Sequence, residues 1–191
     1  MKIISIGLLA AMIGGLSAFA APAAGEKSVV IIYGSRYGST AQTAAWIAEG
    51  MAGKAMVVSA KDAGDLSGYE KVILGSGIYG DMLHADMIAF LEKRGEEVRS
   101  KLLALYVVCG TPPDQARGYL DMFAAQCKAT PLLLRAFNGW QKKELLSAED
   151  LKGLEGYYKS VNQPFENYDH TDKAKCLDFG KEILAKMNEV K

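Results

Sequence analysis

The chain of 191 residues has few cysteines, few histidines and no net charge. Three cysteines are too few for a disulfide-built scaffold, and with only two histidines a metal site of nitrogen and sulfur ligands is not expected. Lys and Arg number 22, and so do Asp and Glu, so no basic excess exists to attract nucleic acid. Hydrophobic residues make up 50% of the chain, unlike the composition of disordered proteins. The composition therefore predicts one folded domain with no nucleic-acid partner.

The N-terminal segment lacks any charge from Ile3 to Gly25. Small residues at Ala18 and Ala20 follow the apolar stretch, which predicts a signal peptide over 1–20, a linker over 21–27 and a domain over 28–191. The alternative is an uncleaved anchor, because about 20 apolar residues can span a bilayer. In either case we expect an exported, periplasmic or extracytoplasmic protein that meets the membrane only through this segment.

The remaining chain alternates apolar β-branched runs with helical patterns. Five strands are predicted, at 28–34, 55–60, 71–75, 102–109 and 132–137. Helical spacing lies between them, at about 41–53, 83–93, 115–128 and 171–187, and a short helix is expected after Ser147 and Asp150, which match a capping box. Strands that alternate with helices predict an α/β fold with a mostly parallel sheet covered on both faces.

The first strand ends in a loop that suits one phosphate group. Hydroxyl side chains and a glycine follow the strand directly, in the run Ser35, Arg36, Tyr37, Gly38, Ser39 and Thr40. Such a loop at a helix N-terminus offers hydroxyls, backbone N–H groups and a positive helix dipole. The absence of Gly-Lys-Ser or Gly-Lys-Thr excludes a magnesium-nucleotide loop. The plain alternative is that Ser39 and Thr40 only cap the helix.

The third strand leads into Gly75, Ser76, Gly77, Ile78, Tyr79 and Gly80, which match the Gly-x-Gly-x-x-Gly dinucleotide pattern. A dinucleotide site also needs an acidic residue at the end of the next strand, where this chain has Cys109, Gly110 and Thr111. The glycines instead allow the backbone to approach a flat ring, with Ile78 and Tyr79 beside it. A phosphate loop after strand one and a ring loop after strand three together predict a site for flavin mononucleotide (FMN).

The motifs also resemble those of a known family. The run from Ser35 to Thr40 resembles the phosphate loop of flavodoxins, and 108–111 resembles their third flavin-contacting loop. With 69–80, His84 and 168–172 added, the chain is most similar to menaquinone-dependent protoporphyrinogen oxidases and their flavodoxin-domain relatives. The resemblance implies a flavodoxin-like three-layer sandwich whose five-stranded parallel sheet has the order 2-1-3-4-5, with FMN between strands one and three.

The resemblance assigns a role to each candidate residue. The residues expected to hold the phosphate are Ser35, Arg36, Tyr37, Gly38, Ser39 and Thr40, and those expected to contact the isoalloxazine ring are Ser76, Gly77, Ile78, Tyr79 and Gly80. Gly110 and Thr111 are expected at the pyrimidine edge of the ring, and a carbonyl near Gly77 is expected to accept a proton-bearing flavin N5. No catalytic side chain and no metal are implied, because the chemistry of such proteins belongs to the cofactor.

The expected function is electron transfer or FMN-dependent oxidation outside the cytoplasm, with a redox partner protein or a quinone as partner. Tyr37 stands where the relatives carry a hydroxyl or Asp, so its side chain is expected to point outward or over the ligand. Residues 139–169 lack the strongly basic insertion of the oxidases, which weakens the quinone assignment, and the export signal disfavours the haem-synthesis role most, because that chemistry belongs on the cytoplasmic side in the oxidases. Two alternatives remain: a binding module that has lost its flavin, and a nicotinamide-dependent quinone reductase. Cys127 and Cys176 are candidates for one disulfide if they lie close enough in the fold.

Overall fold

The structure is a computed structural model that describes residues 28–189 of the chain. The predicted signal peptide at 1–20 and the linker at 21–27 lie outside the described residues. Among the described residues no helix is both long and apolar enough to cross a membrane.

The central sheet has the predicted order. Its parallel strands run β2-β1-β3-β5-β6 across the sheet, which is the order 2-1-3-4-5 when the strands of this path are numbered along the chain. Their bounds are Ser28–Gly34 for β1, Ala55–Ser59 for β2, Tyr69–Tyr79 for β3, Leu102–Cys109 for β5 and Leu133–Asn138 for β6. A two-residue strand, β4 (Met82–Leu83), pairs antiparallel with the end of β3. The flavodoxin-like fold class is therefore confirmed.

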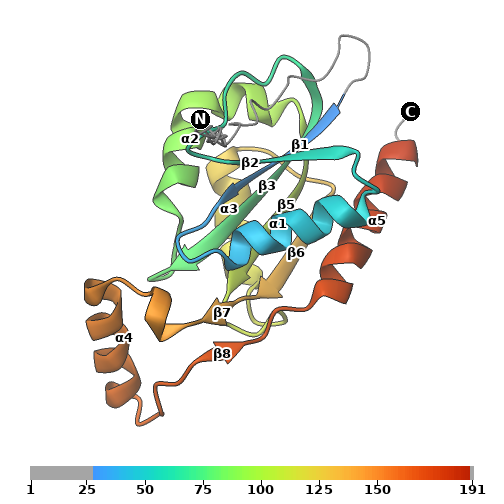
Figure 1. Cartoon of the computed structure of the whole chain (residues 1–191). Coiled ribbons are helices and arrows are strands. Elements are labelled where there is room, and N and C mark those ends of the chain that lie inside the picture. Colours follow the sequence, from blue (N-terminus) through green and yellow to red (C-terminus); the bar gives the residue numbers. More distant parts are fainter. Residues whose placement is uncertain (1–27, 190–191) are drawn as a thin grey trace, which may run out of the picture.

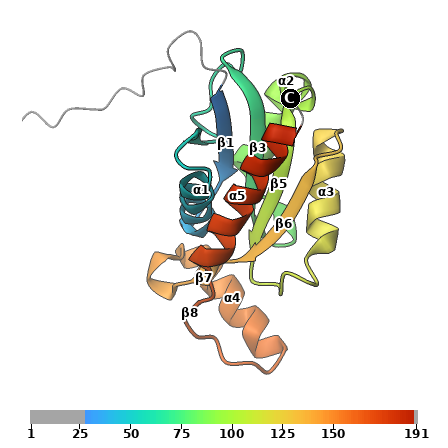
Figure 2. The same cartoon turned by 90° about the vertical axis from the view of Figure 1, so that its right-hand side faces the viewer.

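The sheet is covered by two helices on each face. Helices α1 (Ser39–Gly50) and α5 (Lys173–Glu189) pack on one face, while α2 (Ala85–Arg99) and α3 (Arg117–Cys127) pack on the other. Figures 1 and 2 show these three layers, with α5 crossing the sheet beside α1 and with α3 on the opposite side. The strands are buried on both faces, which explains why their sequences are continuous apolar runs.

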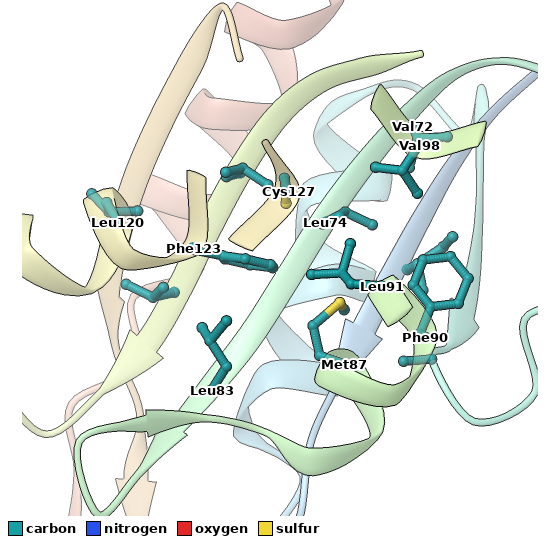
Figure 3. Packing of buried hydrophobic residues seen from close by; sticks show 14 of the residues in the cluster. Val72, Leu74, Leu83, Met87, Phe90, Leu91, Val98, Leu120, Phe123 and Cys127 are labelled. Atoms are coloured by element: carbon teal, nitrogen blue, oxygen red, sulfur yellow. The ribbon is translucent and has the colours of Figure 1, made fainter. Parts of the chain in front are cut away.

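Each face of the sheet has its own apolar core. On the α2–α3 face, Met87, Phe90 and Phe123 pack against Val72 and Leu74 of β3, as Figure 3 shows. The second core, between the sheet and α1 and α5, contains the edge-to-face ring pairs Tyr106–Phe137 and Phe137–Phe179. Cys127 belongs to the first core and Cys176 to the second, so the sheet separates them and all three cysteines are free.

A separate substructure follows β6, and we call residues 139–169 the excursion. It contains β7 (Trp140–Gln141), a 3-10 helix η1 (Lys143–Leu145), α4 (Ala148–Ser160) and β8 (Tyr168–Asp169), and β7 pairs antiparallel with β8. The Ser147 hydroxyl accepts a hydrogen bond from the Asp150 N–H at 3.1 Å, so the predicted N-terminal cap of this helix is confirmed. The carboxyl ends of the strands point towards the excursion (Figure 1).

The third strand is longer than predicted. It runs from Tyr69 through Tyr79, so residues 76–79 form strand rather than the expected loop. The physical reason is that both neighbours offer hydrogen-bonding partners: Gly77 pairs with Val108 of β5, and Ile78 pairs with Leu83 of β4. The chain then reverses at Gly80, whose φ of +54° favours glycine.

Candidate functional site

The predicted phosphate loop, Ser35–Thr40, leads from the buried strand β1 into α1, and we keep the name phosphate loop for it. Gly38 is the N-cap residue of α1 and has a φ of +92°, a conformation that side-chain-bearing residues rarely adopt. The Gly38 N–H donates to the Ser35 hydroxyl at 3.1 Å, which closes the turn. No side chain caps α1, and its first turn contains no acidic residue. The first N–H groups of this helix are therefore left for another acceptor, and an anion suits them.

Thr40 supplies a second polar group at the same place. Its side chain is completely buried, and its hydroxyl has no hydrogen-bonding partner within residues 28–189. A hydroxyl taken out of water without a partner costs stability. A Cβ atom placed on Gly77 would lie 2.9 Å from the Thr40 hydroxyl oxygen, so the end of β3 touches the phosphate loop here. The two segments predicted to form one site are thus in contact.

Tyr79 makes the link between these segments closer still. Its hydroxyl accepts a hydrogen bond from the Arg36 backbone N–H at 2.9 Å. Its ring lies edge-on to the rings of Tyr37 and His84, and the Arg36 guanidinium carbon lies 5.0 Å from its centroid. In the structure the Tyr79 hydroxyl contacts the phosphate loop, and the assignment of Tyr79 to the flavin ring stays a prediction.

The other predicted ring residues lie in the β3–β4 hairpin. Ser76 is buried, its hydroxyl donates to the Gly77 carbonyl at 2.9 Å, and the same oxygen accepts from the His84 N–H. The Gly77 carbonyl also accepts from the His84 N–H at 3.1 Å. A carbonyl oxygen has two lone pairs, so both are used within the hairpin. The expectation that a carbonyl near Gly77 accepts a proton-bearing flavin N5 stays a prediction.

The third predicted segment, Gly110 and Thr111, lies next to the excursion. A Cβ on Gly110 would lie 2.8 Å from the Tyr168 hydroxyl, so β8 covers this glycine closely. The Thr111 carbonyl accepts from the Asn138 side-chain amide at 3.0 Å. The structure thus brings the end of β5 to the same edge as the phosphate loop, with Tyr168 beside it.

The excursion also contacts the phosphate loop directly, which the sequence did not predict. The Trp140 indole N–H donates to the Tyr37 carbonyl at 2.9 Å, and its ring lies against Gly38. The Asp150 carboxylate accepts from the Arg36 guanidinium at 2.6 Å and from the Tyr37 hydroxyl. The capping box indicated that Asp150 begins a helix, but no local pattern indicates a contact with residues more than 100 positions away.

These contacts determine the electrostatics of the loop. The Tyr37 hydroxyl, followed by Arg36, lowers the pKa of the Asp150 carboxyl because both stabilise its charged form. Arg36 is correspondingly paired, so its charge is partly balanced by Asp150. The attraction of the loop for an anion therefore rests mainly on the uncapped helix and the Thr40 hydroxyl.

His84 holds the hairpin to the start of α2. It is the N-cap residue, its Nδ1 accepts from the Asp86 N–H at 3.2 Å, and it is 9% exposed. This confirms the expectation that His84 begins a helix by hydrogen bonding. Burial lowers the pKa of His84, Asp86 opposes that effect, and Arg36 adds to it.

A pH dependence of stability follows from His84. Its pKa is lower in the folded protein than in the unfolded chain, so the unfolded state takes up a proton first as the pH falls. This contribution to stability is complete well above pH ~6.5 and is lost as the pH falls through the lower folded pKa. We expect urea unfolding to show that the parent chain loses more stability between pH 7.5 and 5.5 than His84→Asn, which keeps a capping side chain. Equal losses in both proteins would show that His84 does not titrate on unfolding.

The site residues fit the phosphate end of FMN. The helix N-terminus is uncapped, the Thr40 hydroxyl lacks a partner, and β3 meets the loop at a glycine. Aromatic side chains for a flat ring lie at the same edge, namely Tyr79, Trp140 and Tyr168. Within residues 28–189, no three His, Cys, Asp or Glu side chains gather as a metal ion would require.

Comparison with known proteins agrees with this geometry. Residues 30–148 match the family model described as flavodoxin domain. A search of curated proteins gave no match.

Solved structures show the same fold at low sequence identity. A flavodoxin from the domain Archaea has a TM-score of 0.53 and 16% identity, and the alignment covers 84% of this chain and 99% of that one. The two-electron reduced flavodoxin of Megasphaera elsdenii has a TM-score of 0.55 and 16% identity, covering 82% and 98%. The flavodiiron core from Synechocystis has a TM-score of 0.53 and 14% identity, covering 86% of this chain and 36% of that one.

Proposed function

The chain belongs to the flavodoxin domain family, whose fold binds FMN and transfers electrons, and on this premise we propose that it binds FMN at the edge formed by the phosphate loop and the end of β3. The Thr40 hydroxyl carries this proposal, because it is fully buried, lacks a partner and lies at an uncapped helix N-terminus. A phosphate oxygen is the acceptor that such a hydroxyl and such N–H groups require.

Each segment of the site has a separate task in this proposal. The phosphate loop binds the phosphate monoester through the N–H groups at the start of α1 and the hydroxyls of Ser35, Ser39 and Thr40. Trp140 covers Gly38 and holds the excursion against the loop. The bound flavin supplies the redox chemistry, and the protein positions it and limits its contact with water.

The proposed role is electron transfer or FMN-dependent oxidoreduction with a redox partner protein or a quinone. The finer assignment to the branch of menaquinone-dependent protoporphyrinogen oxidases rests on the resemblance of 69–80, His84 and 168–172 alone. We also propose that the protein acts outside the cytoplasm, because residues 1–20 have the pattern of a signal peptide. Membrane contact, in this proposal, is limited to that segment if it stays uncleaved.

A second candidate function is a flavodoxin-fold binding module without flavin. Two observations favour it: the Tyr79 hydroxyl already occupies the Arg36 N–H, and Asp150 partly neutralises Arg36. Both lower the affinity of the loop for a phosphate dianion. The scaffold alone does not decide between the two functions.

Spectroscopy and calorimetry distinguish the candidates. We expect protein purified from its native compartment to show flavin absorbance bands in near-stoichiometric amount, and the flavin-free protein to bind one FMN on titration. The control is the same titration with a nicotinamide dinucleotide, for which no heat is expected. Colourless protein that gives no heat with FMN would refute the proposed function and support the flavin-free module.

A further inference from the structure

The Tyr79 hydroxyl occupies a backbone N–H of the phosphate loop that a bound phosphate could otherwise use. Its oxygen accepts the Arg36 N–H at 2.9 Å, although the two residues are 43 positions apart. The same oxygen would lie 2.8 Å from a Cβ on Gly77, and the Thr40 hydroxyl would lie 2.9 Å from that same atom. The phenol oxygen and the unpartnered Thr40 hydroxyl therefore both lie close against Gly77, and the phenol oxygen joins this glycine to the Arg36 N–H.

We propose that Tyr79 is a specificity-determining residue whose hydroxyl competes with the flavin phosphate for the Arg36 N–H. This inference rests on the proposed function, because it concerns the same site. A phosphate monoester approaches the N–H groups of the loop, and the phenol must leave the Arg36 N–H before the phosphate can accept it. A flavin without phosphate does not need this N–H, so the hydroxyl reduces the preference for FMN over riboflavin.

The energetic balance favours displacement by a charged ligand. The phenol is a neutral acceptor, whereas the phosphate is ionised, and hydrogen bonds to ionised groups are about twice as strong. The phenol oxygen is fixed in the plane of the ring, so the Tyr79 ring itself must shift when the oxygen leaves the Arg36 N–H, and the edge contacts with Tyr37 and His84 oppose that shift. The competition therefore costs affinity without preventing binding.

The variant Tyr79→Phe removes the hydroxyl and retains the ring. We expect it to bind FMN about tenfold more tightly than the parent chain, and riboflavin with an affinity within about twofold, since one hydrogen bond is at stake. The matched control is Tyr69→Phe, at the opposite end of the same strand, where the hydroxyl lies near the Met56 sulfur. That variant is expected to leave both affinities unchanged in calorimetric titrations.

A second measurement separates this inference from the proposed function. The Arg36 amide resonance is followed by NMR while inorganic phosphate is added to the parent chain and to Tyr79→Phe. Competition predicts that the amide shifts at about tenfold lower phosphate concentration in the variant. If phosphate behaves so but neither protein binds FMN, the flavin proposal fails, while the competition between the Tyr79 hydroxyl and a phosphate for the Arg36 N–H stands.

Two results would overturn the role of Tyr79. An unchanged response of Tyr79→Phe to both phosphate and FMN would mean that the hydroxyl does not compete. Weaker binding of FMN by the variant, with riboflavin unaffected, would mean that the phenol donates to the bound phosphate instead of giving way to it.

Discussion

Replacing Thr40 with valine is expected to weaken the binding of FMN about ten- to a hundredfold, because one hydrogen bond to a charged phosphate is lost. The same change is expected to leave the flavin-free protein as stable as the parent or more so. The Thr40 hydroxyl is buried without a partner, and valine fills nearly the same volume without a polar atom. Opposite effects on stability and on binding identify a group retained for a ligand.

Thr43→Val is the matched control for this prediction. Thr43 lies on the same helix and is 1% exposed, and its hydroxyl interacts with the buried Cys176 thiol rather than with the phosphate loop. It is one turn farther from the phosphate loop, so the variant is expected to bind FMN like the parent. Calorimetric titration measures the affinities and urea unfolding measures the stabilities. If both variants weaken FMN binding equally, the effect comes from helix α1 as a whole and the role of Thr40 is wrong.

The variant Gly180→Ala is expected to lower the free energy of unfolding by about 3 kcal/mol or more, since overpacking of this kind has no cheap relaxation. A methyl group on Gly180 of α5 would overlap the Ile47 carbonyl oxygen of α1, and one on Gly50 would overlap the Leu177 carbonyl oxygen. The two helix backbones are thus in direct contact, and a side chain would force them apart. Because α1 carries the start of the phosphate site, FMN affinity is expected to fall as well.

Gly95→Ala tests whether the loss is specific to that contact. Gly95 lies inside α2, and a Cβ there meets nothing within 4 Å. Alanine is a better helix former than glycine, so this variant is expected to gain about 0.5–1 kcal/mol. Chemical denaturation followed by circular dichroism measures both variants. A Gly180→Ala protein as stable as the parent would show that α1 and α5 can separate without cost.

The strands show how far local sequence determined the fold. Runs such as 102–109 are apolar at every position, so their side chains must be buried on both faces of the sheet, which requires a layer of helices on each face. Alternation of strands and helices predicted a mostly parallel sheet, and the strand order implied by the family resemblance is the one observed. The third strand was underestimated because its last residues, 76–79, form strand only through partners in β4 and β5.

Helix α5 gives a similar lesson about faces. The helical spacing over 171–187 predicts that Leu177, Gly180, Leu184 and Met187 share the buried face. The buried positions are instead Cys176, Phe179, Gly180 and Ile183, and Met187 is partly buried against the same core. Helical spacing identifies an apolar face of the helix but not which residues lie at the middle of that face, because this depends on where the neighbouring helix makes contact. Here the close contact of Gly180 with α1 determines that centre.

The sequence by itself determined the layers of the fold, because these follow from hydrophobic periodicity, and it predicted a phosphate loop from a glycine-containing turn before a helix. The strand order came from the resemblance to flavodoxins. Only the tertiary structure decided that the Tyr79 hydroxyl accepts a hydrogen bond from the Arg36 N–H and that the Asp150 carboxylate accepts hydrogen bonds from the Arg36 and Tyr37 side chains. These contacts join residues 43 to 114 positions apart. The physical reason is that a side chain's partner in space is set by how the elements pack, and no local pattern of residue types records that arrangement.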